Sequence, residues 1–425
     1  MDRNGGETVE RRDFDSSNLD LPSMLARLDD GDLETLRSAV TAIRSAVDDD
    51  PEPYLPTVPK LRSLLEAGPL ALDADDPPRG DGADDVDESG DSEANDVTET
   101  DDDEAPAVTE TDDETDADLT ASDDAGGAGE AAETDESDDG TEGITRAAIE
   151  DLQLDIAYCL AKLAVESPDD VAPSAEVIVS VVADAPDHPA RTDLLRCLAA
   201  VAAERPDAVV DRVDEVVALL ESLDGHDRWG IALLARLSAE YPTAIEPAIP
   251  LLAGAVEEDA EAAGVPALRA LGRLVRADVA KPHAVVPVAA DALEDDRSFE
   301  NTTLHATALG CLSDAAETAP AVVRPRCPTI VAALDGEDPN ARATAAVTLA
   351  RVAAGVDDPA AAIEPGRSRL LELLEDDRAV VRANACVALG YGEVDDAVGR
   401  LEDLSRVDPD PNVRERAAWA VDRLR

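Results

Sequence analysis

Four arginines recur at one distance before an apolar residue, and guanidinium groups in a regular row suit the recognition of carboxylates or phosphates. Each stands seven residues before a leucine or valine: Arg191, Arg342, Arg382 and Arg414. An aspartate precedes three of them by four residues: Asp187, Asp338 and Asp410. The row either binds a ligand or forms a structural ladder of aspartate–arginine bridges between repeats. Because its distance to the apolar anchor is constant, we predict the structural ladder.

A second row of cations follows the same anchors by two residues: Lys162, Arg236, Arg273, Arg351 and Arg423. At the end of a helix a cation meets the negative end of the helix dipole, and it can also pair with acids on helix B, the second helix of the same repeat. A structural role is therefore favoured. The alternative is an anion-binding stripe, which is the best nucleic-acid candidate in the chain.

Residues with catalytic or metal-binding chemistry are scattered. The four histidines have no second histidine four residues away, and the five cysteines lie in separate repeats without C-x-x-C spacing. No phosphate-binding glycine loop, H-E-x-x-H or G-x-S-x-G motif occurs. We therefore predict no enzyme activity, no cofactor and no metal site, and we assign the cysteines to the core.

The elements that position these side chains repeat along the chain. Apolar anchors begin at Leu160, Leu198, Leu234, Leu271, Leu309, Leu349 and Leu389, 36 to 40 residues apart. Apolar residues around each anchor have helical spacing, and a proline pair of the form P-x4-P follows most anchors, as at Pro168 and Pro173. The first proline suits the first turn of a second helix. Each repeat is thus predicted to be a pair of helices, A and B.

The period, the helix pair and the Asp-x-x-x-Arg pattern resemble HEAT repeats, over about residues 21–72 and 144–425. The pattern departs at Gln153, Asp227, Gly264 and Thr302, which stand where the arginine belongs. The last stretch, with Asp410 and Arg414 before Trp419, resembles the shorter HEAT-like units of phycobilisome lyases. The resemblance implies an all-α fold, an α-solenoid of about eight stacked antiparallel helix pairs, with a disordered acidic insertion.

Charge is extreme and unevenly distributed. The formal net charge is −61, and lysine occurs only at Lys60, Lys162 and Lys281. Such a composition keeps a protein hydrated in concentrated salt, so we infer an extremely halophilic source. Residues 73–142 hold 31 acidic side chains and one basic side chain. With so few apolar residues this tract is predicted to be disordered. Solvation is its favoured role; cation binding, nucleic-acid mimicry, phosphorylation and a decoy on the binding face are the alternatives.

The predicted domains follow from these patterns. Residues 1–20 form a disordered N-terminus, 21–72 an N-terminal HEAT-like repeat, 73–143 the disordered acidic insertion and 144–425 the solenoid. The N-terminus lacks the apolar core of a secretory signal, and no apolar run is long enough to span a membrane. A cytoplasmic location is therefore expected.

A solenoid of this type implies a non-catalytic scaffold or adaptor that holds a protein partner on a concave face lined by the B helices. Exposed positions near the second proline of each repeat are the expected contacts: Arg212, Glu215, Asp291, Arg326 and Arg369. The alternatives are a nucleic-acid-binding HEAT-like protein and a lyase-like enzyme or subunit of one. Net acidity makes nucleic acid the weaker partner class. The sequence does not define an oligomeric state.

Overall fold

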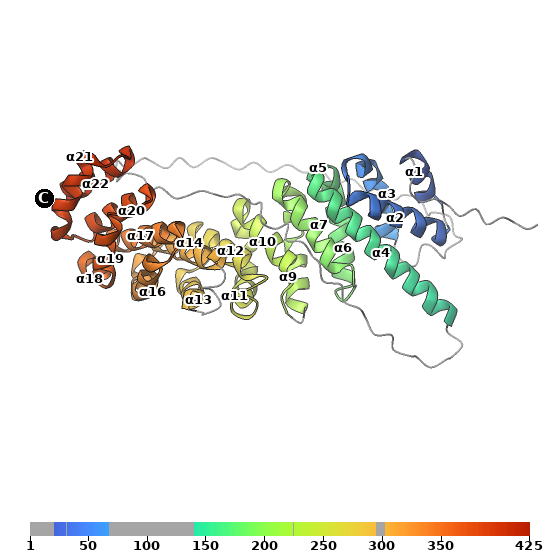
Figure 1. Cartoon of the computed structure of the whole chain (residues 1–425). Coiled ribbons are helices and arrows are strands. Elements are labelled where there is room, and N and C mark those ends of the chain that lie inside the picture. Colours follow the sequence, from blue (N-terminus) through green and yellow to red (C-terminus); the bar gives the residue numbers. More distant parts are fainter. Residues whose placement is uncertain (1–20, 31, 68–139, 224, 295–301) are drawn as a thin grey trace, which may run out of the picture. The chain divides into compact units, whose positions relative to one another are not determined.

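A computed structural model describes residues 21–30, 32–67, 140–223, 225–294 and 302–425, and these are helices and turns without a strand. The predicted all-α solenoid of eight antiparallel helix pairs is confirmed over this part of the chain. The described chain divides into two compact units with a boundary after Arg236, inside helix α10. Figure 1 labels helices of both units.

Unit 1 contains residues 21–67 and 140–236. Its elements are α1 (Leu21–Leu28), α2 (Leu33–Val47), η2 (Glu52–Thr57), α3 (Val58–Ala67), α4 (Gly140–Glu166), α5 (Pro168–Val171), η4 (Ala172–Ser174), α6 (Ala175–Asp184), α7 (Arg191–Glu204), α8 (Asp207–Val210), α9 (Val213–Ser222) and the first part of α10 (Arg228–Glu240). The A helices stack in the order α2, α4 and α7, and the B helices in the order α3, α6 and α9. Two layers of helices result.

Unit 2 contains residues 237–425. Its elements after α10 are η5 (Pro242–Ala248), α11 (Ile249–Glu258), α12 (Gly264–Arg276), α13 (Pro282–Glu294), α14 (Thr302–Thr318), α15 (Pro320–Val323), η7 (Arg324–Arg326), α16 (Cys327–Ala332), η8 (Ala333–Asp335), α17 (Pro339–Ala354), α18 (Pro359–Ile363), η9 (Glu364–Gly366), α19 (Arg367–Leu373), α20 (Ala379–Tyr391), η10 (Asp395–Ala397), α21 (Val398–Val407) and α22 (Pro411–Arg423).

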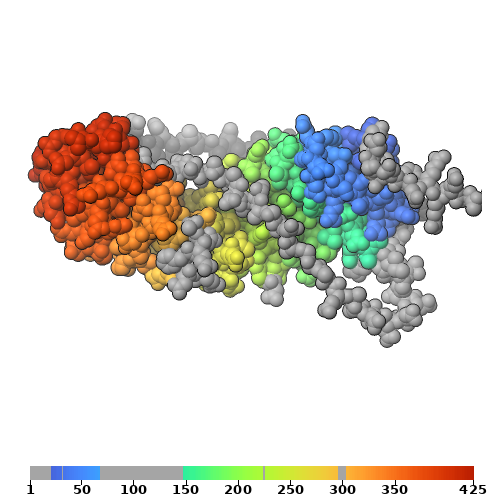
Figure 2. All heavy atoms as spheres, viewed as in Figure 1, coloured from blue at the N-terminus to red at the C-terminus, as the bar shows by residue number. Residues whose placement is uncertain are grey.

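The A layer of unit 2 runs through α12, α14, α17, α20 and α22, each packed on the next. The B layer contains α11, α13, α16 and α19, with the 3₁₀ turns between them. In Figure 2 the surface of unit 2 passes from yellow to red in chain order, as expected when each repeat contacts its sequence neighbours. Its core is a continuous seam of leucine, valine and alanine between the two layers.

The B helices differ from the prediction at their first turn. In most repeats the first proline opens only a short turn, and the second lies in a 3₁₀ segment, as Pro173 does in η4; the long helix begins afterwards. Proline inside a helix removes a backbone hydrogen bond and its ring clashes with the preceding turn, so the chain tightens there. Only α13 among the described B helices runs unbroken from its first proline, Pro282, through Pro287.

Two predicted segments fall mainly outside the described residues: the N-terminal residues 1–20 and the acidic insertion 73–143. The exception is the end of the insertion, because α4 begins at Gly140 rather than after residue 143.

Candidate partner-binding surface

Arg212 and Glu215, predicted to contact a partner, are paired with each other in unit 1. Arg212 precedes α9, and its guanidinium donates to both carboxylate oxygens of Glu215. It also reaches α6, with Ser180 Oγ at 3.3 Å and Glu176 at 3.8 Å. The hydrogen bonds from Arg212 lower the pKa of Glu215. Both side chains remain partly exposed, with 26% and 45% of their surface accessible.

The other three predicted contacts lie in the B layer of unit 2. Arg326, at the end of η7, lies 3.5 Å from Asp291 of α13, so two of the predicted residues meet across one repeat boundary. Arg369 of α19 lies 2.9 Å from Asp335 and 2.7 Å from Glu372, and it donates to the carbonyl of Leu334. Each arginine is about one-third exposed.

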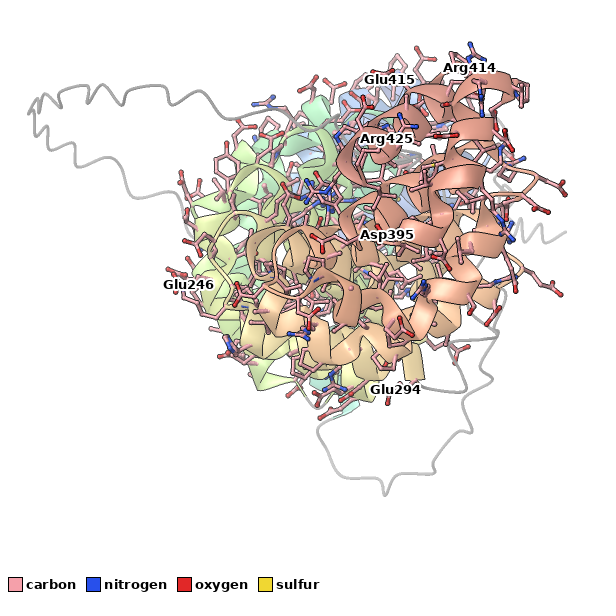
Figure 3. The ribbon with its side chains drawn as sticks, turned by 90° about the vertical axis from the view of Figure 1, so that its left-hand side faces the viewer. Glu246, Glu294, Asp395, Arg414, Glu415 and Arg425 are labelled. Carbon is pink, nitrogen blue, oxygen red and sulfur yellow. The ribbon has the colours of Figure 1, made fainter. Side chains whose placement is uncertain are left out.

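These bridges share a spacing that the sequence analysis missed. Arg212 with Glu176, Arg326 with Asp291, and Arg369 with Asp335 are 34 to 36 residues apart, close to one repeat. Thr329 and Glu294 add a contact of the same kind, with 2.8 Å between their oxygens. A search for opposite charges one period apart would have found the acidic partners. Glu246 and Glu294 point outward at the margin of unit 2 (Figure 3).

The arginines of the ladder lie in the first turns of A helices α7, α17, α20 and α22. Arg342 lies 2.9 Å from Asp376 and Arg382 makes two hydrogen bonds of 2.9 Å to Asp408, so each arginine contacts an aspartate of the following repeat. Arg382 and Arg414 also donate to the backbone carbonyls of Asp376 and Asp408. In unit 1, Arg191 is 3.9 Å from Asp227 and donates to the carbonyl of Pro186.

The aspartates of the Asp-x-x-x-Arg pattern do a different task. Asp338 and Asp410 cap α17 and α22, since their carboxylates accept hydrogen bonds from the first backbone N–H groups of these helices. Arg382 has no aspartate four residues before it and pairs with Asp408. Its hydrogen bonds hold the pKa of the Asp408 carboxyl below the ordinary value. The ladder therefore pairs the arginine of the pattern with a different aspartate, one that lies outside the pattern.

Three members of the second cationic row contact the preceding A helix or its C-cap, rather than the acids of helix B that we expected: Lys162, Arg236 and Arg351. Lys162 lies 3.2 Å from Asp48 at the end of α2. Arg351 donates to Ser313 of α14 at 2.8 Å and lies 3.4 Å from Glu317. Arg423 lies over the rings of Tyr391 and Trp419, 4.7 and 5.9 Å from their centroids.

The cysteines are buried, as predicted for core residues, and none forms a disulfide. Burial raises the pKa of Cys159 and Cys386 to about 12 and of Cys327 to about 11, so these thiols stay protonated and unreactive. His188 accepts a hydrogen bond from the backbone of Ala190 and contacts Gln153 at 2.9 Å. Within the described ranges, no three His, Cys, Asp or Glu side chains gather as they would around a metal ion.

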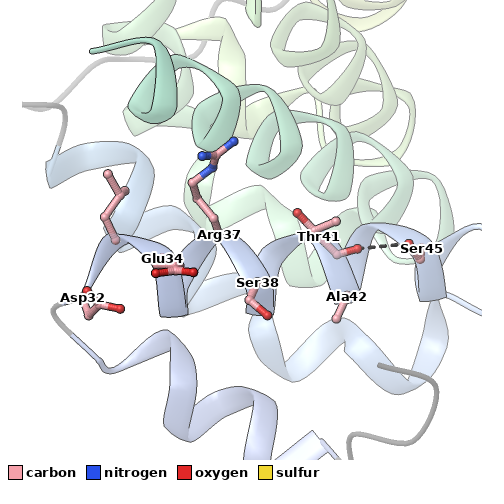
Figure 4. A pocket seen from close by; sticks show the side chains of 8 residues that line it. Asp32, Glu34, Arg37, Ser38, Thr41, Ala42 and Ser45 are labelled. Atoms are coloured by element: carbon pink, nitrogen blue, oxygen red, sulfur yellow. Dashed lines mark hydrogen bonds between the residues drawn. The ribbon is translucent and has the colours of Figure 1, made fainter. Parts of the chain in front are cut away.

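One hollow of about 680 Å³ lies along α2. Asp32, Glu34, Arg37, Ser38, Thr41 and Ser45 line it, with the apolar Leu33 and Ala42. Figure 4 shows that Arg37 points from α2 towards the blue-green helix α4. The lining residues that the structure describes form neither a nucleophile with its base nor a set of metal ligands. None of the helices described in either unit is long and apolar enough to cross a bilayer.

The fold and these contacts define a class of protein, the all-helical repeat solenoid. The profile of HEAT repeats matches residues 367–425. An engineered protein solved by the Northeast Structural Genomics Consortium is similar in fold, with a TM-score of 0.66 at 18% identity, over 95% of this chain and 88% of the other.

Two further solved structures match less well. A second engineered protein from that consortium has a TM-score of 0.43 at 20% identity, over 50% of this chain and 98% of its own. A designed armadillo repeat protein in complex with the peptide (KR)4 has a TM-score of 0.39 at 16% identity, over 58% and 98%. No curated protein matches the chain. Repeats of the HEAT and armadillo type typically mediate protein binding.

Proposed function

We propose that this protein is a non-catalytic scaffold or adaptor that holds a protein partner on the face formed by its B helices. The observation that carries this proposal is the series of half-exposed charged pairs on the B layer of unit 2, at Arg326 with Asp291 and at Arg369 with Asp335. The two pairs lie in adjacent repeats, so an extended partner would meet the same chemistry in each of them.

The charge of unit 2 supports a protein partner over a nucleic acid. Residues 237–425 contain 33 acidic and 19 basic side chains, a net charge of −14. Phosphate binding needs a local stripe of cations that can release counterions. In the second cationic row Lys162 and Arg351 contact carboxylates, and Arg423 lies over aromatic rings. A partner surface that carries cationic side chains would complement the surplus of carboxylates.

Affinity capture from native lysate at molar salt tests this function. The intact chain is compared with the double variant Arg326→Glu and Arg369→Glu, and retained proteins are identified by mass spectrometry. The matched control reverses two exposed arginines outside the B-layer pairs, Arg378 and Arg425. We expect the control to retain the partner and the test variant to lose it.

The melting temperature of both variants separates binding from folding. Exposed ion pairs contribute about 0 to 1 kcal/mol, so neither variant should melt much lower than the parent. A parallel loss of capture and stability in the test variant would refute the assignment of these arginines. Retention that nuclease abolishes would favour nucleic acid as the partner.

A further inference from the structure

The joint between α2 and α4 in unit 1 contains an in-register stripe of complementary side chains. Three positions of α2 and its C-cap, Asp48, face four positions of α4. The two residues of each facing pair are 114 positions apart in the sequence. The pairs are Arg37 with Asp151 at 3.0 Å, Thr41 with Asp155 at 3.0 Å, Arg44 with Tyr158 at 4.7 Å between guanidinium and ring centroid, and Asp48 with Lys162 at 3.2 Å. Both stripes have the spacing 4, 3, 4 of one helical face.

The order of charges along this stripe specifies how the two helices align. The α2 side carries cation, hydroxyl, cation and anion, whereas the α4 side carries anion, anion, phenol and cation. Arg44 also pairs with Asp155, and the Tyr158 hydroxyl donates to Asp48 at 2.5 Å. A shift of α4 by one helical turn, three residues, would place Arg44 opposite Asp155 but would place Arg37 opposite Ala148, so Arg37 would lose Asp151. Opposed charges of this kind select register and partner more than they add affinity.

An apolar seam lies beside the charged stripe. Leu36, Ala39, Val40, Ile43 and Val47 of α2 are all buried, at 2% exposure or less. Leu61 and Leu65 of α3 are equally buried, and α3 packs on both α4 and α6. Arg62 adds a hydrogen bond of 3.1 Å to the carbonyl of Pro173 in η4. Apolar burial supplies the driving force for contact, and the stripe supplies its specificity.

The residues that make the contacts between α2 or α3 and α4 or α6 are not neighbours in the sequence. Helix α3 ends at Ala67 and α4 begins at Gly140, so residues 68–139 separate the two sides in the sequence. The helices α1, α2 and α3 also contact one another, with Met24 and Leu28 of α1 buried. The N-terminal segment therefore has an internal core and a specific docking side.

We propose that the edge of unit 1 formed by α4 and α6 is a recognition site for the helical segment 21–67. The segment stays bound there through non-covalent contacts alone, even when the chain between residues 67 and 140 is cut. The order of charges in the α4 stripe makes binding specific for this segment, and burial of the apolar seam stabilises it. The stripe consists of Asp151, Asp155, Tyr158 and Lys162. Segment 21–67 is thus a docked module of the protein that a cut chain retains.

Site-specific cleavage of the full chain tests this proposal. A protease recognition sequence is inserted between residues 100 and 101, the folded protein is cut, and the products are separated by size-exclusion chromatography at molar salt. We expect the two fragments to elute together. Separation of the fragments from the otherwise native chain would overturn the proposal.

Charge reversal then tests the stripe. Asp155→Arg places a cation opposite Arg44, and at low salt, where charges are screened least, this should weaken retention of the N-terminal fragment about tenfold or more. Adding Arg44→Asp to the same chain should restore retention. Glu166→Arg, at the exposed end of α4, is the matched control and should retain the fragment.

Circular dichroism of each uncut variant shows whether the chain still folds. Undiminished retention by Asp155→Arg, or no rescue by the reversed pair, would show that charge order does not direct docking and would overturn that part of the proposal. Rescue in the swapped pair distinguishes recognition from a general loss of stability, because misfolding would not be repaired by a second charge reversal.

Discussion

The joint between α2 and α4 in unit 1 and the joint between α20 and α22 in unit 2 achieve the same stacking of A helices by different means. At α2–α4 the polar contacts are more open: Arg37 and Asp151 are 44% and 62% exposed, and Arg44 and Asp155 are 47% and 18% exposed. At α20–α22 the ion pair is enclosed, with Arg382 and Asp408 at 12% and 2%. The first arrangement suits recognition between separate segments, and the second suits permanent attachment.

A glycine distinguishes the two joints as well. Gly390 of α20 allows α22 to approach so closely that a Cβ atom there would lie 3.1 Å from Ala420 Cα and 2.8 Å from the Trp419 ring. The rings of Tyr391 and Trp419 then pack at 4.8 Å between centroids. Helix α2 has no glycine.

Of the substitutions that compare the two joints, removal of the Asp408 carboxylate should lower the free energy of unfolding most. Asp408→Ala leaves the Arg382 guanidinium largely buried without its carboxylate, which should cost about 3 kcal/mol of unfolding free energy. Urea unfolding at molar salt measures this loss. Asp403→Ala removes a carboxylate that is 78% exposed and should change little. Equal effects of the two substitutions would remove the distinction between open and enclosed pairs.

Filling the close approach at Gly390 should have the next largest effect. Gly390→Ala places a methyl group against Trp419 and the backbone of Ala420, so it should cost about 1 to 3 kcal/mol despite the better helix propensity of alanine. Gly310→Ala in α14 meets no atom within 4 Å and should instead stabilise the protein by up to about 1 kcal/mol. Opposite shifts of the two melting temperatures are expected.

Acid should weaken the enclosed pair in a defined pH range. Hydrogen bonds from Arg382 lower the pKa of Asp408 in the folded state, so its contribution is complete above the ordinary aspartate pKa of about 3.9 and is lost as pH falls below it. The difference in melting temperature between the parent and Asp408→Asn should therefore narrow as pH falls from neutrality to about 3. A difference independent of pH would contradict this assignment.

The smallest effect is expected at the open joint. Arg44→Ala removes a half-exposed partner of Asp155 and should cost less than about 1 kcal/mol. Because salt screens exposed charges more than enclosed ones, this cost should shrink between low and molar salt, whereas the cost of Asp408→Ala should persist. Thermal unfolding of both variants across a salt series would reveal the contrast.

Much of the fold follows from the sequence because stacking of helix pairs is local. The anchor at Leu389 and the cysteine at Cys386 are both buried, as their place in an apolar stripe predicts. The break at Pro173 was missed, because the fit of the first proline to a helix start says nothing about the second proline. Its ring and missing N–H force the 3₁₀ turn.

The partners of the arginines were harder to predict. Asp410 stands four residues before Arg414 and looks like its partner, yet its carboxylate is used to cap α22. Asp408, two residues earlier, points back to Arg382 of the preceding repeat. In a chain with 97 acidic residues, nearness in sequence cannot choose among such carboxylates. The choice depends on loop geometry, which only the three-dimensional structure defines.

The constant separation of 114 residues across the α2–α4 joint has an evolutionary consequence. Residues 68–139 can gain or lose length without altering any facing pair, whereas a change at Arg44 needs a matching change at Asp155. In descendants of this chain, positions 37, 44 and 48 should therefore vary together with positions 151, 155 and 162, while the separation between the two sets drifts freely.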